Sequence, residues 1–145
     1  MATVSTYLIF HRTAEQAFTF YKSVFNTEYV GPIARFSQMP AGEQSPPLAE
    51  ADKNLVLHVA LPILGGYMLM GSDCVEAMGS KVAVGNNVYI NLQPDTRAES
   101  DRLFKELSAG GQIEMPMQEM FWGDYFGSFA DKFGTKWMIA CSSKT

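Results

Sequence analysis

The residue best suited to acid–base chemistry is a histidine inside the apolar run NLVLHVAL, residues 54–61. Because an imidazole titrates near neutral pH, His58 could give or take a proton in a reaction. Strand alternation predicts one apolar face, made of Leu55, Leu57, Val59 and Leu61. The opposite face then carries Val56, His58 and Ala60. Two interpretations stay open: His58 is a catalytic or ligand-binding residue, or it is a structural residue that makes a hydrogen bond.

Polar side chains also recur at alternate positions of NNVYINL, residues 86–92. The apolar positions predict the face that a helix would bury, made of Val88, Ile90 and Leu92. The opposite face carries Asn87, Tyr89 and Asn91, which can bind a ligand through hydrogen bonds. Alternatively, the asparagines belong to a sheet edge or a turn.

Two methionines lie in a further strand-like run, YMLMGS, residues 67–72. Pairing of this strand with the His58 strand would put Met68 and Met70 beside the imidazole. Thioether side chains are adaptable and polarizable, so the two residues can line an irregular pocket or fill the core.

Several catalytic motifs are absent from the sequence. There is no Cys-x-x-Cys, no His-Glu-x-x-His, no Walker loop and no Gly-x-Gly-x-x-Gly, which disfavours zinc and nucleotide sites. The Gly-Ser-Phe at 127–129 lacks the pattern of a nucleophile elbow. Asp124 and Asp131 could form an acid–base pair, but their neighbours favour turn and cap roles.

The composition is that of one globular domain of 145 residues, with 47% hydrophobic and 18% charged residues and a net charge of −4. No run of Lys or Arg is present, so we expect no nucleic-acid partner. The N-terminal stretch has neither a basic region nor a long apolar segment, so we expect a cytoplasmic protein with no membrane span. Cys74 and Cys141 are expected to be reduced thiols.

Hydrophobic periodicity predicts the same order of elements twice along the chain. The first set comprises a strand at 5–11, a helix at 12–25, and strands at 27–39, 55–63 and 67–73. The second set comprises a strand at 86–93, a helix at 95–111, and strands at 112–118, 122–130 and 135–142. The pattern is a tandem βαβββ repeat of the α+β class.

Caps and turns delimit these elements. Thr13 and Gln16 form a candidate capping box on the first helix, and Asn26 can end it. Asp95 or Thr96 caps the second helix, and Gly110-Gly111 stops it. A hairpin is expected at 64–66, and the proline-rich segment 39–53 is expected to be a lid or a disordered loop.

The sheet predicted for each βαβββ unit has one face covered by the helix of that unit. Its other face must be covered by something else. If the two uncovered faces curl toward each other, they line a cleft suited to a small molecule. On the last strand, Trp137 and Ile139 should face the helix, while Lys136 and Met138 face the cleft.

Three motifs resemble a known family: AEQAFTFYKSVF, HVALPILGGYMLMGSD and FWGDYFGSFADKFGTKWMI. Together with the tandem βαβββ plan they are similar to the PhnB-like branch of the glyoxalase, bleomycin-resistance and extradiol-dioxygenase superfamily. The resemblance covers nearly the whole chain. It implies a single domain over 1–145, made of modules 1–73 and 85–145 that form a U-shaped cleft, in a homodimer.

The resemblance also bears on metal chemistry. In metal-dependent relatives four strand positions hold the ion, and the matching positions here are Thr6, Met68 or Met70, Asn87 and Met138. None is His or Glu, and hard divalent ions avoid thioethers. We therefore expect no metal and no cofactor. Tyr125 stands where similar proteins often have Arg, which removes a cation that could hold an anionic ligand.

The function that we expect is metal-free binding of a small, partly aromatic ligand. The candidate binding residues are His58, Met68, Met70, Asn87, Tyr89, Asn91, Trp122, Tyr125 and Met138. One alternative is an enzyme of the lyase, isomerase or dioxygenase type, with His58 as general acid or base or with a divalent metal at unexpected ligands. Another is a subunit whose cleft is filled by Trp122 and Phe126.

Overall fold

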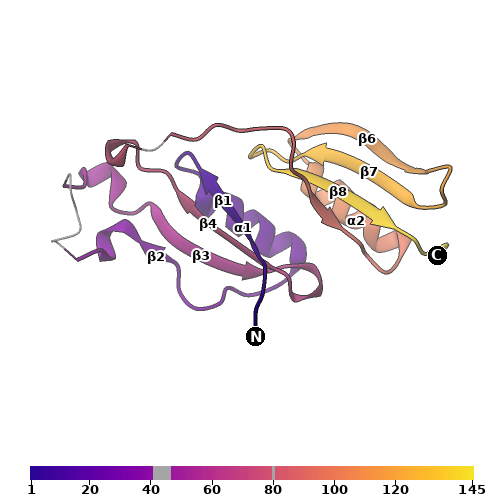
Figure 1. Ribbon diagram of the computed structural model, residues 1–145, viewed down its shortest axis with the longest axis horizontal. Helices are drawn as coiled ribbons and strands as arrows, with labels where there is room; N and C mark the ends of the chain where they lie inside the picture. The colour runs from indigo at the N-terminus through magenta and orange to yellow at the C-terminus, as the bar shows by residue number, and fades with distance from the viewer. Residues whose placement is uncertain (41–46, 80) are drawn as a thin grey trace. The chain divides into compact units, whose positions relative to one another are not determined.

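The computed structural model describes residues 1–40, 47–79 and 81–145 (Figure 1). The chain divides into two compact units, Met1–Ala83 and Val84–Thr145. Within the described residues, each unit has one α-helix and one four-stranded sheet. This arrangement confirms the α+β class. No helix of the described residues is long and apolar enough to cross a bilayer.

The first unit has a sheet with the strand order β1-β4-β3-β2. Its strands are β1 (Thr6–Phe10), β2 (Ala34–Arg35), β3 (Val56–Pro62) and β4 (Met68–Asp73). Strands β1 and β4 run parallel, and β4 is antiparallel to β3. Its short 3-10 helices are η1 (Phe36–Gln38), η3 (Glu50–Asp52), η4 (Leu64–Gly66) and η5 (Glu76–Met78). The hairpin expected at 64–66 is thus present between β3 and β4.

Helix α1 (Ala14–Phe25) covers one face of this sheet because its apolar residues recur at helical spacing. Its buried residues are Ala14, Ala17, Phe18, Tyr21 and Val24. The ring of Phe18 lies against Gly71, where an added Cβ would come within 2.6 Å of it. The helix ends at Asn26 in the left-handed conformation, which confirms the predicted stop.

The predicted capping box on α1 was wrong. Thr13 makes no side-chain capping bond. Instead the buried carboxylate of Asp73, at the end of β4, accepts from the Ala14 N–H at 2.9 Å and from the Val56 N–H at 2.9 Å. One tertiary carboxylate therefore joins α1, β3 and β4, and a local sequence pattern does not reveal such a cap.

Two strand predictions in the first unit also need correction. The strand expected over 27–39 is reduced to Ala34–Arg35, preceded by Gly31 at φ 75° and a proline. In β3, Ala34 pairs with His58 and Arg35 with Val56, so Leu57 is an extra residue in a bulge. A bulge shifts the alternation by one, which is why Val56 is buried rather than Leu57. Residues 41–46 of the predicted 39–53 loop lie outside the described residues.

The second unit has a sheet with the strand order β5-β8-β7-β6. Its strands are β5 (Ile90–Leu92), β6 (Gln112–Glu119), β7 (Tyr125–Ala130) and β8 (Lys136–Cys141). Helix α2 (Arg97–Ser108) starts at Thr96, whose hydroxyl accepts from the Glu99 N–H, so Thr96 rather than Asp95 is the cap. The helix stops before Gly110, which has φ 76°.

The core of the second unit lies between α2 and the sheet. Trp137 and Ile139 are fully buried, which confirms that they face the helix, while Lys136 and Met138 are half-buried and alternate with them. An added Cβ on Gly127 would come within 2.9 Å of Phe104 from α2. Strand β5 is shorter than predicted: Val88 is 73% exposed instead of facing the helix, and Asn87 lies before the strand.

Candidate functional site

The first open face is the side of the first sheet away from α1, and it includes Tyr7, Ile9, His58 and Met70. Its central contact is between two rings: the Tyr7 hydroxyl lies 3.3 Å from His58 Nδ1. The rings stack with centroids 5.7 Å apart and planes 28° apart. Met70 lies in register with Tyr7 on β1 and with Ala60 on β3. Strand pairing therefore gathers a phenol, an imidazole and a thioether.

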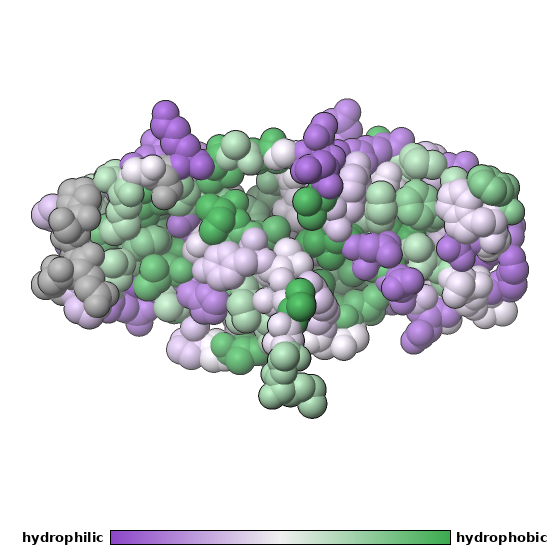
Figure 2. Space-filling model, in the orientation of Figure 1, coloured by the Kyte–Doolittle hydropathy of each residue, from purple (hydrophilic) through white to green (hydrophobic). Residues whose placement is uncertain are grey.

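His58 is exposed, although its neighbour Val59 is buried. Tyr7 and Ile9 are 47% and 49% exposed. Figure 2 shows apolar residues on the visible surface of both units, among more hydrophilic ones. The first open face thus offers apolar surface together with two hydrogen-bonding rings.

A cavity of about 690 Å³ lies in the first unit beside this face. Tyr7, Ile9 and Ser72 of the sheet line it, together with Met78 and Val82 of the segment that follows β4. The volume is within the range of ligand pockets. Tyr7 lines the cavity and also contacts His58, whereas His58 itself does not line the cavity.

The second open face is the side of the second sheet away from α2. Its residues are Asn91, Phe126, Ser128, Lys136 and Met138. Asn91, Met138 and Ser128 form one row across β5, β8 and β7. The structure therefore brings together the predicted residues Asn91 and Met138, whereas Asn87 is exposed and outside the strand.

A three-residue polar cluster lies beside this row. The Lys136 ammonium makes a hydrogen-bonded ion pair with Glu114 and lies 3.4 Å from the Tyr89 hydroxyl, which donates to Glu114 at 2.8 Å. The hydrogen bond from Lys136 lowers the pKa of the Glu114 carboxyl, and Glu114 in turn raises the pKa of Lys136. Sequence periodicity pointed to Tyr89 and to the direction of Lys136, but Glu114 comes from a strand with irregular register.

The structure places Tyr125 on the helix side of β7. Its hydroxyl donates to Asp101 at 2.6 Å, and the Arg97 guanidinium lies 4.8 Å from its ring centre. The bond to Asp101 raises the pKa of the phenol. Tyr125 was predicted to line the binding surface, and this position corrects that placement, because Tyr125 pairs with the buried Cys141 rather than with an open-face residue.

Trp122 lies in the connection between β6 and β7 and is 53% exposed. Its Nε1 donates to Asp124 at 3.2 Å, and its ring makes edge contacts with Phe121 and Phe126. Met68 lies opposite Pro62, further along β3 from His58 than Met70 does.

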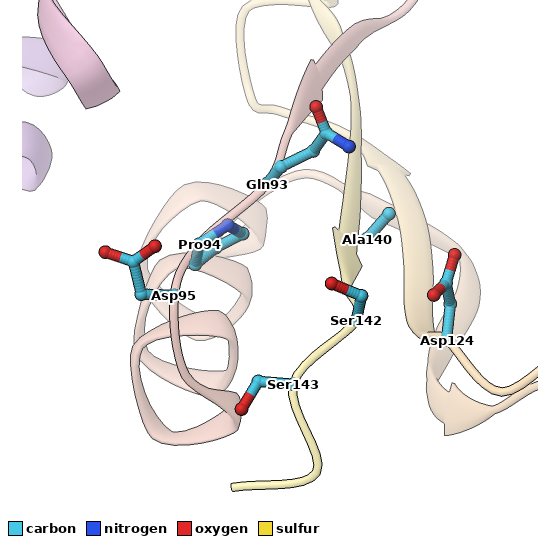
Figure 3. A pocket seen from close by; sticks show the side chains of 7 residues that line it. All are labelled: Gln93, Pro94, Asp95, Asp124, Ala140, Ser142 and Ser143. Atoms are coloured by element: carbon cyan, nitrogen blue, oxygen red, sulfur yellow. The ribbon is translucent and has the colours of Figure 1, made fainter.

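A smaller polar pocket of about 250 Å³ lies in the second unit (Figure 3). It is lined by Gln93, Pro94, Asp95, Asp124, Ala140, Ser142 and Ser143. The figure shows these side chains coming from the turn before α2, from β8 and its extension, and from Asp124, the residue before β7. Most are loop residues, which periodicity does not find.

Within the described residues, no three His, Cys, Asp or Glu side chains lie together in a way that could hold an ion. The positions matched to metal ligands carry threonine, methionine and asparagine. The expectation of a metal-free site stays a prediction.

Residues 2–140 match the family model described as 3-demethylubiquinone-9 3-methyltransferase. The chain belongs to this family. The resemblance to PhnB-like proteins that the motifs indicated is confirmed, and the chain has the fold of glyoxalase and bleomycin-resistance proteins.

Some similar proteins match over nearly the whole chain. Protein YjdN of Escherichia coli is 31% identical over 94% of this chain and 92% of its own length. Among solved structures, protein PA1353 from Pseudomonas aeruginosa is 30% identical with a TM-score of 0.83, covering 97% of this chain and 98% of that one. The PhnB protein from Bacillus cereus is 26% identical with a TM-score of 0.75, covering 97% and 99%.

The family's description names methyl transfer, for which S-adenosylmethionine would be the methyl donor. Such cofactors favour a glycine-rich turn between a strand and a helix. Here the turns at residues 11–13 and 93–96 contain no glycine. The first N–H of α1 is bound to Asp73, and the Glu99 N–H of α2 is bound to Thr96. These residues do not fit such a cofactor site.

Proposed function

We propose that this protein binds a small, partly aromatic molecule at the first open face, with Tyr7 and His58 in direct contact with it. The observation that carries the proposal is the stacked, hydrogen-bonded Tyr7–His58 pair next to the 690 Å³ cavity. A phenol and an imidazole offer both donors and acceptors, and Ile9 and Met70 offer apolar contact. This chemistry requires no metal.

The ligand is proposed to be flat and mostly apolar. Aromatic rings stack against other aromatic rings, and a thioether such as Met70 adapts to the ring edge. The family resemblance further supports a homodimer, and the sequence supports a cytoplasmic location. Light scattering of the purified protein at several concentrations would test the dimer.

Thermal shift assays with a panel of aromatic amides and quinones test the binding proposal. A ligand present at 100 times its Kd stabilises the folded state by about 2.7 kcal/mol, which is easily measured as a rise in Tm. The rise should be strongly reduced in Tyr7→Phe and His58→Ala. The matched control is His11→Ala, since His11 is exposed and its ion-pair partner within the described residues is Glu76, at 3.2 Å. Absence of stabilisation by every compound would contradict the proposal.

The second candidate function is acid–base catalysis by His58. The observation that favours it is the Tyr7 contact with Nδ1, which orients the imidazole. Incubation of a stabilising compound with the wild type and with His58→Ala, followed by mass spectrometry, separates binding from turnover. Product formed by the wild type alone would support catalysis. Metal analysis of protein purified without chelator tests the alternative with a divalent ion.

A further inference from the structure

We propose that Lys136, Tyr89 and Glu114 form a second binding site, on the second open face, that holds the carbonyl oxygen of a neutral aromatic ligand. The inference rests on the proposed small-molecule function but concerns residues of the other unit. It names the class of ligand: an aromatic amide, ketone or quinone rather than an aromatic carboxylate.

The donor that would bind the oxygen is the Lys136 ammonium. An ammonium has three N–H donors. One bonds to Glu114 and one to the Tyr89 hydroxyl, so in the part of the chain that the structure describes a third is available for a ligand. The side chain of Lys136 is only 17% exposed, and its ammonium also lies 5.1 Å from the Tyr89 ring centre. These contacts fix the position of the charge, so little side-chain entropy is lost when a ligand binds.

The charge of the cluster selects the ligand. Glu114 neutralises Lys136, so the pair presents a donor without a net positive charge. A carboxylate ligand would meet the Glu114 carboxylate at close range and be repelled. A neutral carbonyl accepts the hydrogen bond without that penalty. The ion pair also keeps Lys136 protonated, since it raises the pKa of the amine, so the lysine acts as a donor rather than as a nucleophile.

The ring of the ligand has a place on the neighbouring row. Lys136 contacts Tyr89, and Asn91, Met138 and Ser128 form a row on the same face, two residues further along β8. Two residues along a strand span about 6.6 Å, which matches the reach from a carbonyl oxygen to the far side of a benzene ring. The Met138 thioether would contact the ring edge. Met138 stands at a position that metal-using relatives give to a ligand, and here it would serve as apolar contact.

Benzamide and benzoate form a matched pair of probes, because they share the ring and the carbonyl and differ in one group: the neutral NH2 of the amide stands where benzoate has its charged oxygen. Titration of the ¹⁵N-labelled full chain, followed by amide NMR shifts, reports both affinity and location. Benzamide should shift the amides of Ile90–Leu92 and Lys136–Met138 in the wild type and bind more tightly than benzoate. Lys136→Met should weaken benzamide about tenfold, the loss of one charge-assisted hydrogen bond. The control Lys105→Met, on the exposed surface of α2, should leave its affinity unchanged.

The variant Glu114→Gln provides a second, independent test, which remains valid even if Lys136→Met does not fold. It removes the repelling carboxylate and leaves the ammonium, so benzoate should bind about tenfold more tightly. Equal benzamide affinity in the wild type and Lys136→Met would overturn the inference, and so would a preference of the wild type for benzoate or no gain in Glu114→Gln. If benzamide does not bind, while another compound raises the Tm of the wild type but not of His58→Ala, the second site is refuted and the proposed function stands.

Discussion

At the residue scale, the acidic residues of the two most recognisable motifs serve the fold. Asp73 ends the LMGSD motif and accepts two backbone N–H groups. Asp131 opens the DKFG turn and accepts from the backbone of Phe133 and Thr135, and from Trp137 Nε1 at 2.9 Å. Both carboxylates are buried and bonded on both oxygens, so neither is available as a catalytic acid or base. The sequence-based preference for turn and cap roles of Asp131 agrees with this geometry.

Asp73→Asn should destabilise the first unit by about 2 kcal/mol, since it removes charge-assisted bonds and turns an amide donor toward a buried N–H. The measurement is the free energy of unfolding from urea titration. The control is Asp101→Asn, an exposed position whose side chain can still accept from Tyr125. A change below about 0.5 kcal/mol in Asp73→Asn, the range of ordinary surface substitutions, would show that the carboxylate is not the cap.

Sequence reasoning found only part of each candidate site. Alternation identified His58, Met70, Asn91 and Met138, because their strands follow a period of two. It missed Tyr7, since the pairing of β1 beside β4 cannot be read from either strand alone. Glu114 was missed for another reason: the irregular register of β6 hides its direction.

At the element scale, each of the helices α1 and α2 packs one of its aromatic rings against a glycine in the sheet. Phe18 of α1 meets Gly71, and Phe104 of α2 meets Gly127. The absence of a side chain lets the ring lie directly on the backbone of the strand. In both units, the contact between an aromatic ring and a glycine thus sets the distance between helix and sheet.

Gly71→Ala should destabilise the protein by about 1–3 kcal/mol, because the new methyl group would overlap the buried Phe18 ring. Thermal or urea unfolding measures the loss. Gly85→Ala is the matched control, as the nearest atom to an added Cβ there is 3.7 Å away. Equal stability of the two variants would mean that α1 can move aside freely.

An ion pair fastens α1 to β2. The Arg35 guanidinium binds both oxygens of Glu15, at 3.0 and 2.8 Å, and this hydrogen bonding lowers the pKa of the Glu15 carboxyl from its ordinary value of 4.5. A lowered pKa in the folded state stabilises the protein above pH 4.5, and this contribution is lost as the pH falls through the folded value.

Glu15→Gln should therefore cost about 0.5 kcal/mol at pH 7, a modest amount because the Glu15 side chain is 48% exposed. The difference from the wild type should shrink toward zero as the pH falls below 4.5. Urea titrations at pH 7, 5 and 3.5 measure it. The control Glu28→Gln, at a carboxylate that is 86% exposed, should differ little from the wild type at neutral pH. A cost for Glu15→Gln that grows at low pH would contradict the assignment.

The order of helices and strands was predictable because their apolar periods are clear, as in α1 and β8. Element ends were less predictable where distant residues decide them. The cap of α1 comes from Asp73, 59 residues away. The bulge at Leu57 depends on pairing with β2, and β5 begins later than its alternation suggests.

At the scale of the whole molecule, the two units repeat one plan with different surface chemistry. The first open face carries an imidazole–phenol pair, and the second carries a lysine–glutamate–tyrosine cluster. The repeat of fold follows from the apolar pattern, which the two halves share. The divergence of their open faces follows from residues that the core does not constrain.

Each unit also contains one buried free cysteine, Cys74 in the first and Cys141 in the second. Both thiols should resist a thiol-reactive dye in the native protein and react after denaturation, because the dye needs access to the sulfur. Mass spectrometry of labelled peptides in increasing urea would measure each site separately. Fast labelling of either cysteine without denaturant would contradict the observed burial.

Such labelling would also show whether the two halves of the chain unfold together. If both cysteines become reactive at the same urea concentration, the two halves unfold as one cooperative block. If one reacts at a lower urea concentration, the two halves unfold separately and differ in stability. Because each half contains one cysteine, labelling of the two thiols measures the unfolding of each half separately, without any introduced probe.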